Sequence, residues 1–196
     1  MMLFIPMLLS GCAKKSSGDV YTRLSEMNSY IANAEVTYIS NKGEDVFETV
    51  QYAKKDGRYR IETTSPEKFA GTALVYDGKL VWQETSGNEN KIKVTSNSPE
   101  RSLLILYSFL ENHGRSMENA VVTTSAAPNA ESTVLEAVIP GDNRFLATEK
   151  LWVNTESGAP EKLVVYTSEG NEKIVVKFSG FRYNENIDDS EFSVTK

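Results

Sequence analysis

Cysteine and histidine are almost absent from this sequence, whose 196 residues include one of each, Cys12 and His113. A disulfide within the chain would need a second cysteine, and a zinc site would need about four ligands, most often cysteine and histidine. Both kinds of site are therefore excluded within this chain, so the domain is held together by packing alone or occurs where disulfides are not routinely made. We expect no metal ion and no cofactor.

Positive charge is also scarce. The chain carries 21 lysines and arginines against 27 aspartates and glutamates, which gives a net charge of −6 at pH 7. These charges are spread along the sequence without a concentrated basic cluster. Nucleic-acid binding depends on a concentrated cationic surface. The sequence therefore predicts no nucleic-acid partner.

The chain starts with an apolar stretch, residues 1–9, that is too short to cross a membrane. A spanning helix needs about 20 apolar residues. A short apolar stretch at this position is typical of the hydrophobic region of an export signal. No lysine or arginine precedes it, although the start of an export signal normally carries positive charge.

The single cysteine stands shortly after this stretch. Residues 9–12, Leu-Ser-Gly-Cys, match the lipobox of bacterial lipoproteins, in which the cysteine sulfur is diacylated. A pair of acyl chains anchors a protein stably to a membrane. We therefore expect Cys12 to be lipidated, with residues 1–12 as the lipoprotein signal segment and residues 13–19 as a tether. The alternative, a free or buried thiol, leaves the polar residues after Cys12 unexplained.

Two segments have helical periodicity. Residues 19–34 space apolar side chains along one face and begin with Asp19, a suitable N-cap, which predicts an amphipathic helix. Residues 98–114 are apolar on most sides, with Pro99 in the first turn and Gly114 at the expected end. Such a helix must be covered on several sides or line an apolar space.

Elsewhere, apolar and polar residues alternate with the period of a β-strand, which favours an antiparallel meander. Asp-Gly pairs at 56–57 and 77–78 stand between alternating runs, and this pair is a strong hairpin signal. The runs expected to form strands, one of which holds the second hairpin, are 35–40, 45–55, 58–65, 72–85, 90–96, 119–126, 132–140, 144–156, 161–168 and 171–184. The polar tail after them is expected to be an edge or coil segment.

Two helices and about ten strands predict a single α+β domain over residues 20–196. We expect a strongly curved antiparallel sheet, an open and incomplete β-barrel, with the helices packed on its concave side. One face of the sheet then lies against helices and the other faces water, as the alternation requires. An open barrel has free strand edges that can pair with another chain, so we also expect a homodimer formed by edge-strand pairing.

Several short motifs follow one another in the order found in a known family. They are Arg-Leu at 23–24, the turn in KKDGRYRIET at 54–63, the hairpin in LVYDGKLVWQ at 74–83, and the run from residue 151 to residue 194. Through these motifs residues 20–194 resemble the lipoprotein-carrier (Lol-type) family, and within it most the germination lipoproteins of clostridia. The resemblance implies an open β-barrel closed by helices that shield a hydrophobic cavity.

The resemblance also implies a partner. Clostridial germination lipoproteins of this type are partners of a zinc-dependent N-acetylmuramoyl-alanine amidase of the spore cortex and are not catalytic themselves. It therefore implies an exported protein, anchored to a membrane outside the cytoplasm in the spore or cell envelope, that binds and supports a cell-wall amidase during germination. The alternative is a carrier or chaperone that binds lipid or lipoprotein acyl chains in the cavity.

The sequence contains no recognisable catalytic set, and we expect no enzyme activity. It has no Gly-x-Ser-x-Gly elbow. His113 stands near the expected end of a helix, where an imidazolium favours the helix dipole, so a structural role is preferred. Asp188, Asp189 and Glu191 are the densest acids, but they lack the glycine and the spacing of a calcium loop, which favours a solvated turn.

Large aromatic residues are the remaining candidates for function. Most of them should belong to the core, but aromatic anchors dominate binding hot spots. If Leu151 and Val153 face inward, the alternation turns Trp152 outward, where an exposed ring would mark an interaction site. The residues chosen as candidates for a partner or cavity site are Trp82, Trp152, Tyr76 and Phe109.

Overall fold

The structure of the protein is a computed structural model that describes residues 17–86, 88–94, 99–118, 125–126 and 132–193. Cys12, the tether residues 13–16 and residues 119–124 of one expected strand lie outside the described residues. The helices are α1 (Ser17–Glu26), α2 (Pro99–Ser102) and α3 (Leu106–Glu118), and the short 3-10 turns are η1 (Glu67–Phe69) and η2 (Asp189–Phe192).

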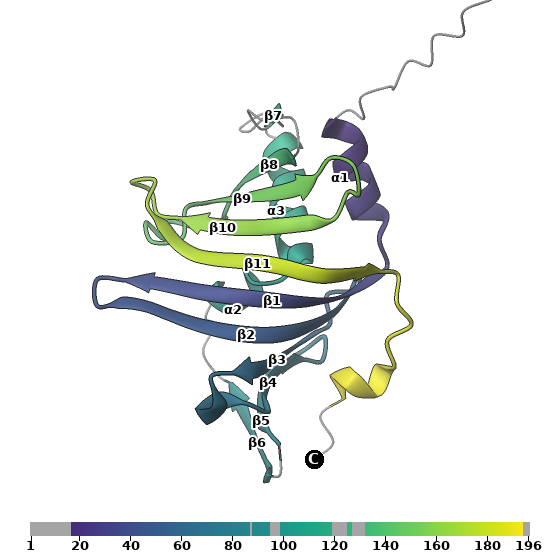
Figure 1. Ribbon diagram of the computed structural model, residues 1–196, viewed down its shortest axis with the longest axis vertical. Coiled ribbons are helices and arrows are strands. Elements are labelled where there is room, and N and C mark those ends of the chain that lie inside the picture. The colour runs from purple at the N-terminus through teal and green to yellow at the C-terminus, as the bar shows by residue number, and fades with distance from the viewer. Residues whose placement is uncertain (1–16, 87, 95–98, 119–124, 127–131, 194–196) are drawn as a thin grey trace, which may run out of the picture.

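The described strands form one antiparallel sheet of eleven strands (Figure 1). Their order across the sheet is β6-β5-β4-β3-β2-β1-β11-β10-β9-β8-β7. The sheet does not close on itself, since β6 and β7 are its two ends, and the predicted open antiparallel sheet is confirmed. The bounds of the strands are β1 Ser29–Ser40, β2 Gly43–Lys54, β3 Tyr59–Ser65, β4 Thr72–Tyr76, β5 Val81–Thr85, β6 Asn88–Val94, β7 Ser125–Ala126, β8 Ser132–Val138, β9 Thr148–Asn154, β10 Pro160–Tyr166 and β11 Glu172–Tyr183.

One face of the sheet carries the core. The strand register aligns one buried apolar residue from each of five neighbouring strands in a row, namely Leu135, Leu151, Leu163, Val176 and Val36. Helices α1 and α3 pack against β8 on this side. Full burial of one such side chain stabilises the fold by about 1.5–3 kcal/mol, so this row is a main source of stability. We call this side the helix face and the opposite side the outer face.

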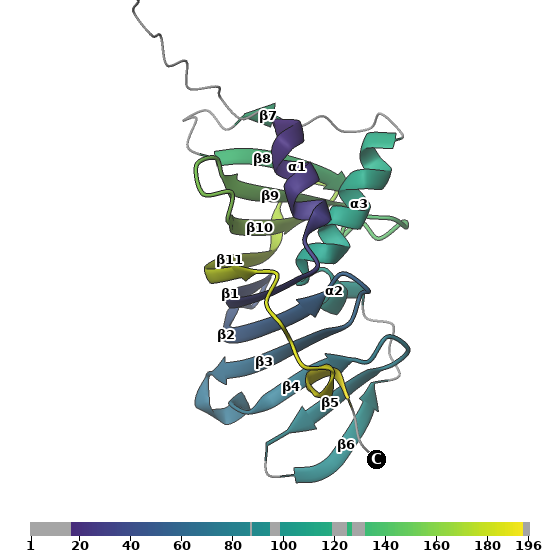
Figure 2. The ribbon, with the colours of Figure 1, turned by 90° about the vertical axis from the view of Figure 1, so that its right-hand side faces the viewer.

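The two halves of the sheet are covered differently. Figure 2 shows α1 and α3 alongside the strands β8–β11, whereas β3–β6 extend beyond these helices. The short helix α2 lies near β1 and β2 (Figure 2). We call β8–β11 with α1 and α3 the covered half, and β2–β6 with α2 the open half.

The prediction of a helix over residues 19–34 is wrong at both ends. The helix runs from Ser17 to Glu26, so Asp19 lies inside it, and the strand β1 already begins at Ser29. Tyr30 follows Met27 at helical spacing, which predicts a helix, yet it belongs to a central strand paired with both β2 and β11. Two hydrogen-bonded neighbours outweigh a local helical pattern, since propensity is a weak prior.

The second helix also differs from its prediction. It is split into α2 and α3, and the buried residues 103–105 form the turn between them. Gly114 does not end the helix, which continues to Glu118. A Cβ at Gly114 would lie 2.7 Å from the Tyr21 hydroxyl, so this glycine allows α1 to approach α3 closely.

Both Asp-Gly hairpins are confirmed. The pair at 56–57 connects β2 to β3, and the pair at 77–78 connects β4 to β5. Gly57 and Gly78 have φ values of +92° and +94°, a region that glycine enters at no steric cost. The Asp77 carboxylate accepts hydrogen bonds from the backbone N–H groups of Lys79 and Leu80, which holds the second turn.

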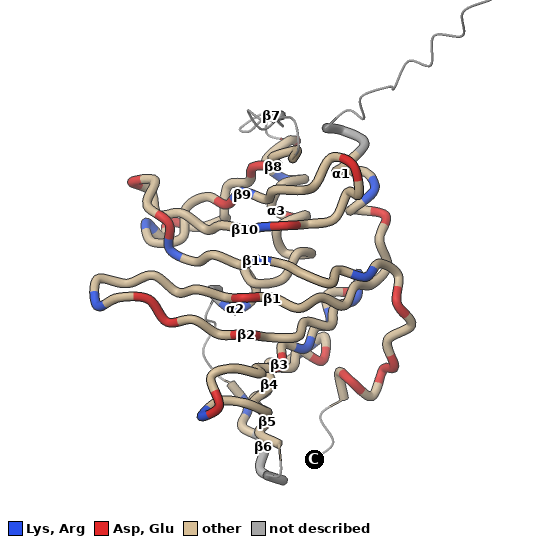
Figure 3. The backbone as a smooth tube through the Cα atoms, in the orientation of Figure 1, with Lys and Arg blue, Asp and Glu red and all other residues tan. Residues whose placement is uncertain are grey.

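The C-terminal segment forms coil and the turn η2, not an edge strand. Its Phe192 is buried, with the cationic groups of Lys54 and Arg58 at 5.5 and 5.4 Å from the ring centre. Asp189 forms ion pairs with the same two residues. Figure 3 shows that acids and bases are interspersed over the sheet, while this segment is mainly acidic. The expected solvated turn is therefore ion-paired to the β2–β3 hairpin.

Candidate functional site

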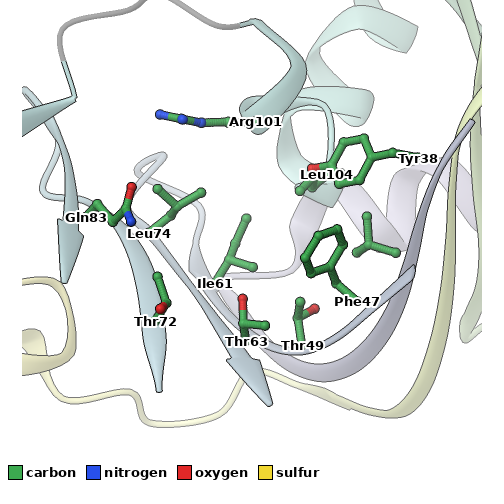
Figure 4. Close-up of a pocket in the computed structure, with 11 residues that line it drawn as sticks. Tyr38, Phe47, Thr49, Ile61, Thr63, Thr72, Leu74, Gln83, Arg101 and Leu104 are labelled. Atoms are coloured by element: carbon green, nitrogen blue, oxygen red, sulfur yellow. The ribbon is translucent and has the colours of Figure 1, made fainter. Parts of the chain in front are cut away.

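A pocket of about 180 Å³ lies on the helix face of the open half. Figure 4 shows its strand residues on one side and two residues from the α2 region on the other. Side chains alternate along each strand, so the register brings every second residue of neighbouring strands to this face. The lining residues are Val36, Tyr38, Phe47, Thr49, Ile61, Thr63, Thr72, Leu74, Gln83, Arg101 and Leu104.

The wall of the pocket is mainly apolar. Phe47, Ile61 and Leu74 come from three strands, and Leu104 closes the pocket from the turn after α2. The Thr49 hydroxyl donates to the carbonyl oxygen of Ala34 at 3.0 Å, so its methyl group remains as the free part of the side chain. Such a wall suits an apolar group and offers few fixed polar contacts.

Arg101 supplies the only charged side chain among the described lining residues. It comes from α2, and its Nη1 atom is buried without a hydrogen-bond partner in the part of the chain that the structure describes. Burial raises the pKa of Tyr59 to about 12, and the positive charge of Arg101 opposes this rise. The guanidinium therefore lies close to the helix face of β3.

Deeper in the core, Tyr30 joins β1, β2 and the start of α3. Its hydroxyl donates to Oε1 of Gln51 at 3.1 Å and accepts from the backbone N–H of Leu106 at 3.2 Å. Burial raises the pKa of Tyr30, so the phenol stays neutral. This contact fixes α3 against the sheet at the boundary between the covered and open halves.

None of the four predicted site residues lines the pocket, and the structure does not bring them together. Phe109 is fully buried in α3 and stacks on His113, with ring centres 5.8 Å apart. Tyr76 is half-buried on the helix face beside Tyr59, at 5.5 Å between ring centres. Both are part of the core or its border rather than of a free surface.

The two tryptophans lie on the outer face. The Trp82 indole N–H donates to the Asp77 carboxylate at 3.1 Å, which ties the ring to its own hairpin. Trp152 faces outward between the buried residues Leu151 and Val153, as the alternation predicts. The Lys162 ammonium lies 4.1 Å from its ring centre, so the ring is half-buried under a cation.

The sequence does contain a signal for the pocket that those four choices missed. Thr49 and Thr63 stand in phase with the buried apolar residues of β2 and β3, where a packed core would place larger apolar side chains. Threonines at core positions of consecutive strands indicate a face that no long helix covers.

The predicted position of His113 at a helix end is wrong. The residue is fully buried inside α3, and its Nδ1 contacts the carbonyl oxygen of Glu136 on β8. Burial lowers the pKa of this imidazole, so it is neutral near pH 7 and gains nothing from the helix dipole. The structural role preferred for His113 stands, but its physical basis is packing between α3 and β8.

A buried carboxyl group lies in the same interface. Asn112 of α3 donates to Oε1 of Glu149 on β9 at 2.9 Å, while Oε2 of Glu149 has no partner among the described residues. Burial raises the pKa of Glu149 to about 7. Both residues are inaccessible to a substrate in this conformation, so we assign them to the packing of α3 on the sheet.

The fold resembles solved structures of lipoprotein-related proteins. The GerS lipoprotein, solved in complex with the CwlD amidase from Clostridioides difficile, matches with a TM-score of 0.52 at 25% identity, over 87% of this chain and 98% of that chain. A putative outer-membrane lipoprotein-sorting protein domain from Vibrio parahaemolyticus matches with a TM-score of 0.50 at 12% identity, over 90% of this chain and 94% of that chain. These likenesses confirm the predicted Lol-type fold.

The sequence comparisons lead to a sporulation family. The chain is 23% identical to the sporulation protein YdcC of Bacillus subtilis over 199 residues, which cover 99% of this chain and 58% of that protein. The chain thus spans little more than half the length of this relative. Among the described helices, none has both the length and the apolar character needed to cross a membrane. Residues 1–192 match the model of the sporulation protein YdcC-like family, and the chain belongs to this family.

Proposed function

We propose that the protein is an exported, membrane-anchored lipoprotein that binds and supports a cell-wall amidase acting on cortex peptidoglycan during spore germination. The observation that carries this proposal is the likeness to GerS, a lipoprotein solved in complex with the CwlD amidase, over nearly the whole of both chains. Membership of the YdcC-like sporulation family supports the setting. The partner would be a zinc-dependent N-acetylmuramoyl-alanine amidase, and the zinc would belong to the partner.

The proposal gives this chain no catalytic step of its own. Its single histidine is buried between α3 and β8. In its acidic C-terminal segment, Asp189 pairs with Lys54 and Arg58, and Asp188 accepts from the backbone N–H of Ser190. These groups serve the fold in the described structure, which supports a binding role.

The membrane anchor would be the lipid chains on Cys12. Residues 17–19 of the expected tether belong to α1, so residues 13–16 would link the anchor to this helix. Intact-mass measurement on protein from the native membrane tests this directly. We expect a chain that starts at Cys12 and carries the added mass of acyl groups. An unmodified thiol on an unprocessed chain would contradict the anchor and leave the amidase proposal without its membrane location.

Binding to the amidase is tested with purified proteins. The full chain with Cys12→Ala and the cortex amidase of the same organism should elute as one complex in size-exclusion chromatography and titrate to a fixed stoichiometry in calorimetry. The amidase should also cleave cortex peptidoglycan faster, or remain folded longer, with the protein than without it. Separate elution at micromolar concentrations, with unchanged amidase activity, would contradict the proposal.

A second function is favoured by the pocket. Its apolar wall suits part of an acyl chain, as in a carrier of lipid or lipoproteins. Its volume of about 180 Å³ is below the roughly 300–1,000 Å³ typical of small-molecule sites, so this function ranks second. Mass spectrometry of the protein purified without detergent tests it, since a carrier should retain lipid and should bind a fluorescent fatty acid.

We also propose that the protein forms a homodimer through a free strand edge. Strand β6 ends the described sheet on the open half, and an unpaired edge is a template for pairing with another chain. Light scattering coupled to chromatography should give twice the monomer mass. A proline placed at Lys93 should return the protein to the monomer if β6 is the edge that pairs.

A further inference from the structure

The size of the pocket in the open half limits what can occupy it. At about 180 Å³ it is slightly larger than an engineered cavity of about 150 Å³ that binds benzene. An occupant of this size is one phenyl ring or one leucine side chain, and a long acyl chain would leave most of its length outside. The pocket therefore fits a single large apolar side chain.

The positive charge of Arg101 favours an acidic group next to the apolar side chain that enters the pocket. Arg101 has a buried Nη1 atom without a hydrogen-bond partner, and none of the eleven described lining residues is acidic. A buried cationic donor without an acceptor is costly, and arginine pairs best with a carboxylate through parallel hydrogen bonds. An incoming acidic group would supply the partner that Arg101 lacks.

Exposed apolar side chains flank the pocket on two sides. Ile92 is 62% exposed and stands opposite the lining residue Gln83 in the β5–β6 register. Phe69 is 41% exposed, and its ring centre lies 5.7 Å from that of the lining residue Phe47. A pocket with apolar flanks is the usual setting of a hot spot in a protein interface.

We propose that the pocket is the docking site for a segment of a protein partner that inserts one phenylalanine or leucine side chain. The ring or branched chain contacts Ile61, Leu74 and Leu104, and a neighbouring aspartate, glutamate or chain-terminal carboxylate pairs with Arg101. The proposal deepens the proposed function, on which it rests, because the segment would belong to the partner amidase.

The chemistry of the pocket is tested first without the amidase. The Cys12→Ala full chain, labelled at isoleucine and leucine methyl groups, is titrated with N-acetylphenylalanine, with its neutral amide, and with octanoate. We expect saturable shifts of the Ile61 and Leu74 signals with N-acetylphenylalanine and at least about tenfold weaker binding of the amide. Equal binding of acid and amide, or binding of octanoate alone, would overturn the proposal.

Two variants and a control locate the effect. Arg101→Gln removes the charge at the mouth and should abolish the preference for the acid over the amide. Leu74→Trp fills the pocket and should abolish binding of both probes. Arg144→Gln removes another arginine, one that lies over the exposed Phe145, and should leave both affinities unchanged. Circular dichroism confirms folding, and Arg101→Gln keeps the test valid if Leu74→Trp misfolds.

The same variants separate this proposal from the proposed function. Arg101→Gln and Leu74→Trp should each weaken the amidase complex at least about tenfold, while Arg144→Gln should not. Undiminished complexes with both pocket variants would overturn the docking site and leave the amidase partnership intact. If the unmutated protein forms no complex, the proposed function fails, and the docking proposal fails with it because it assigns the segment to the amidase.

Discussion

The covered and open halves of the sheet share one architecture and differ in what faces the helices. In the covered half the helix-facing positions hold Leu135, Leu151 and Leu163, all fully buried under α1 and α3. In the open half the equivalent positions include Thr49 and Thr63, and a pocket remains. The difference indicates that side-chain size along one face sets whether a sheet receives a packed helix or keeps a binding space.

Buried polar atoms without a partner among the described residues occur in both halves, although such atoms are normally satisfied. In the covered half, Asn112 and Glu149 are hydrogen-bonded to each other and His113 contacts the backbone of β8, yet Oε2 of Glu149 and Nε2 of His113 remain unpaired. In the open half, Arg101 and Gln51 each have a buried nitrogen without a partner among these residues. The halves differ in where these atoms lie, because Arg101 lines the pocket while Glu149 and His113 lie in the packed interface of α3 and the sheet.

The largest expected effect tests the packing difference directly. Leu151→Ala removes a fully buried side chain in the covered half and should lower the free energy of unfolding by about 4–5 kcal/mol. Ile61→Ala removes a similar side chain that already borders the pocket, and should cost about 2–3 kcal/mol. Urea unfolding of both variants gives the comparison, and equal losses would contradict the distinction between the halves.

The next effect concerns the buried carboxyl group of the covered half. Burial raises the pKa of Glu149 from 4.5 to about 7, so the unfolded chain releases this proton at lower pH than the folded chain. The folded state binds the Glu149 proton more tightly than the unfolded chain does, and this stabilises the fold fully below about pH 4.5. The stabilisation is lost as the pH rises from 4.5 towards 7 and is absent above pH 7. At about 1.36 kcal/mol per pKa unit, the loss is about 3 kcal/mol.

Glu149→Gln keeps the contact with Asn112 and removes the titrating group. The variant should be about as stable as the unmutated protein at pH 4.5 and more stable by up to about 3 kcal/mol at pH 8. The difference between the two unfolding free energies isolates Glu149 from the other acids, which titrate in both proteins. A difference that does not change between pH 4.5 and pH 8 would show that this group is not buried in solution.

Much of the covered half follows from the sequence, because its strands alternate cleanly. The inward Leu151 and Val153 and the outward Trp152 are predicted by period two and are found so. The boundary between α1 and β1 could not be read locally, because the strand character of Tyr30 comes from pairing with β2 and β11. Pairing between distant segments is a property of the fold and has no local signal.

The candidate site was the least predictable part. Of the large aromatic residues predicted for the site, Phe109 lies in the core, and Trp82 and Trp152 lie on the outer face. The pocket instead depends on where large residues are missing, at Thr49 and Thr63, and on Arg101, which α2 places over the sheet. Small side chains on separate strands leave a pocket only when the strand register places them side by side, and a single strand's sequence does not show this register.

The smallest expected effect compares two threonines of the open half. The Thr49 hydroxyl donates to the Ala34 carbonyl oxygen, whereas the Thr63 hydroxyl has no partner among the described residues. Thr49→Val should therefore cost about 1 kcal/mol, the net value of a lost hydrogen bond. Thr63→Val replaces an unpaired hydroxyl with a methyl group that faces the pocket, and should be neutral or stabilising by up to about 1 kcal/mol.

Thermal unfolding resolves these two variants, since about 1 kcal/mol shifts Tm by a few degrees in a domain of this size. Thr63→Val should also bind N-acetylphenylalanine at least as tightly as the unmutated protein, because its pocket wall becomes more apolar. A lower Tm for Thr63→Val together with weaker probe binding would mean that the Thr63 hydroxyl has a role in the pocket. The pocket of the open half would then bind its ligand through polar contacts. The two halves would differ in the polarity of their helix-facing side chains and not only in how tightly these side chains pack.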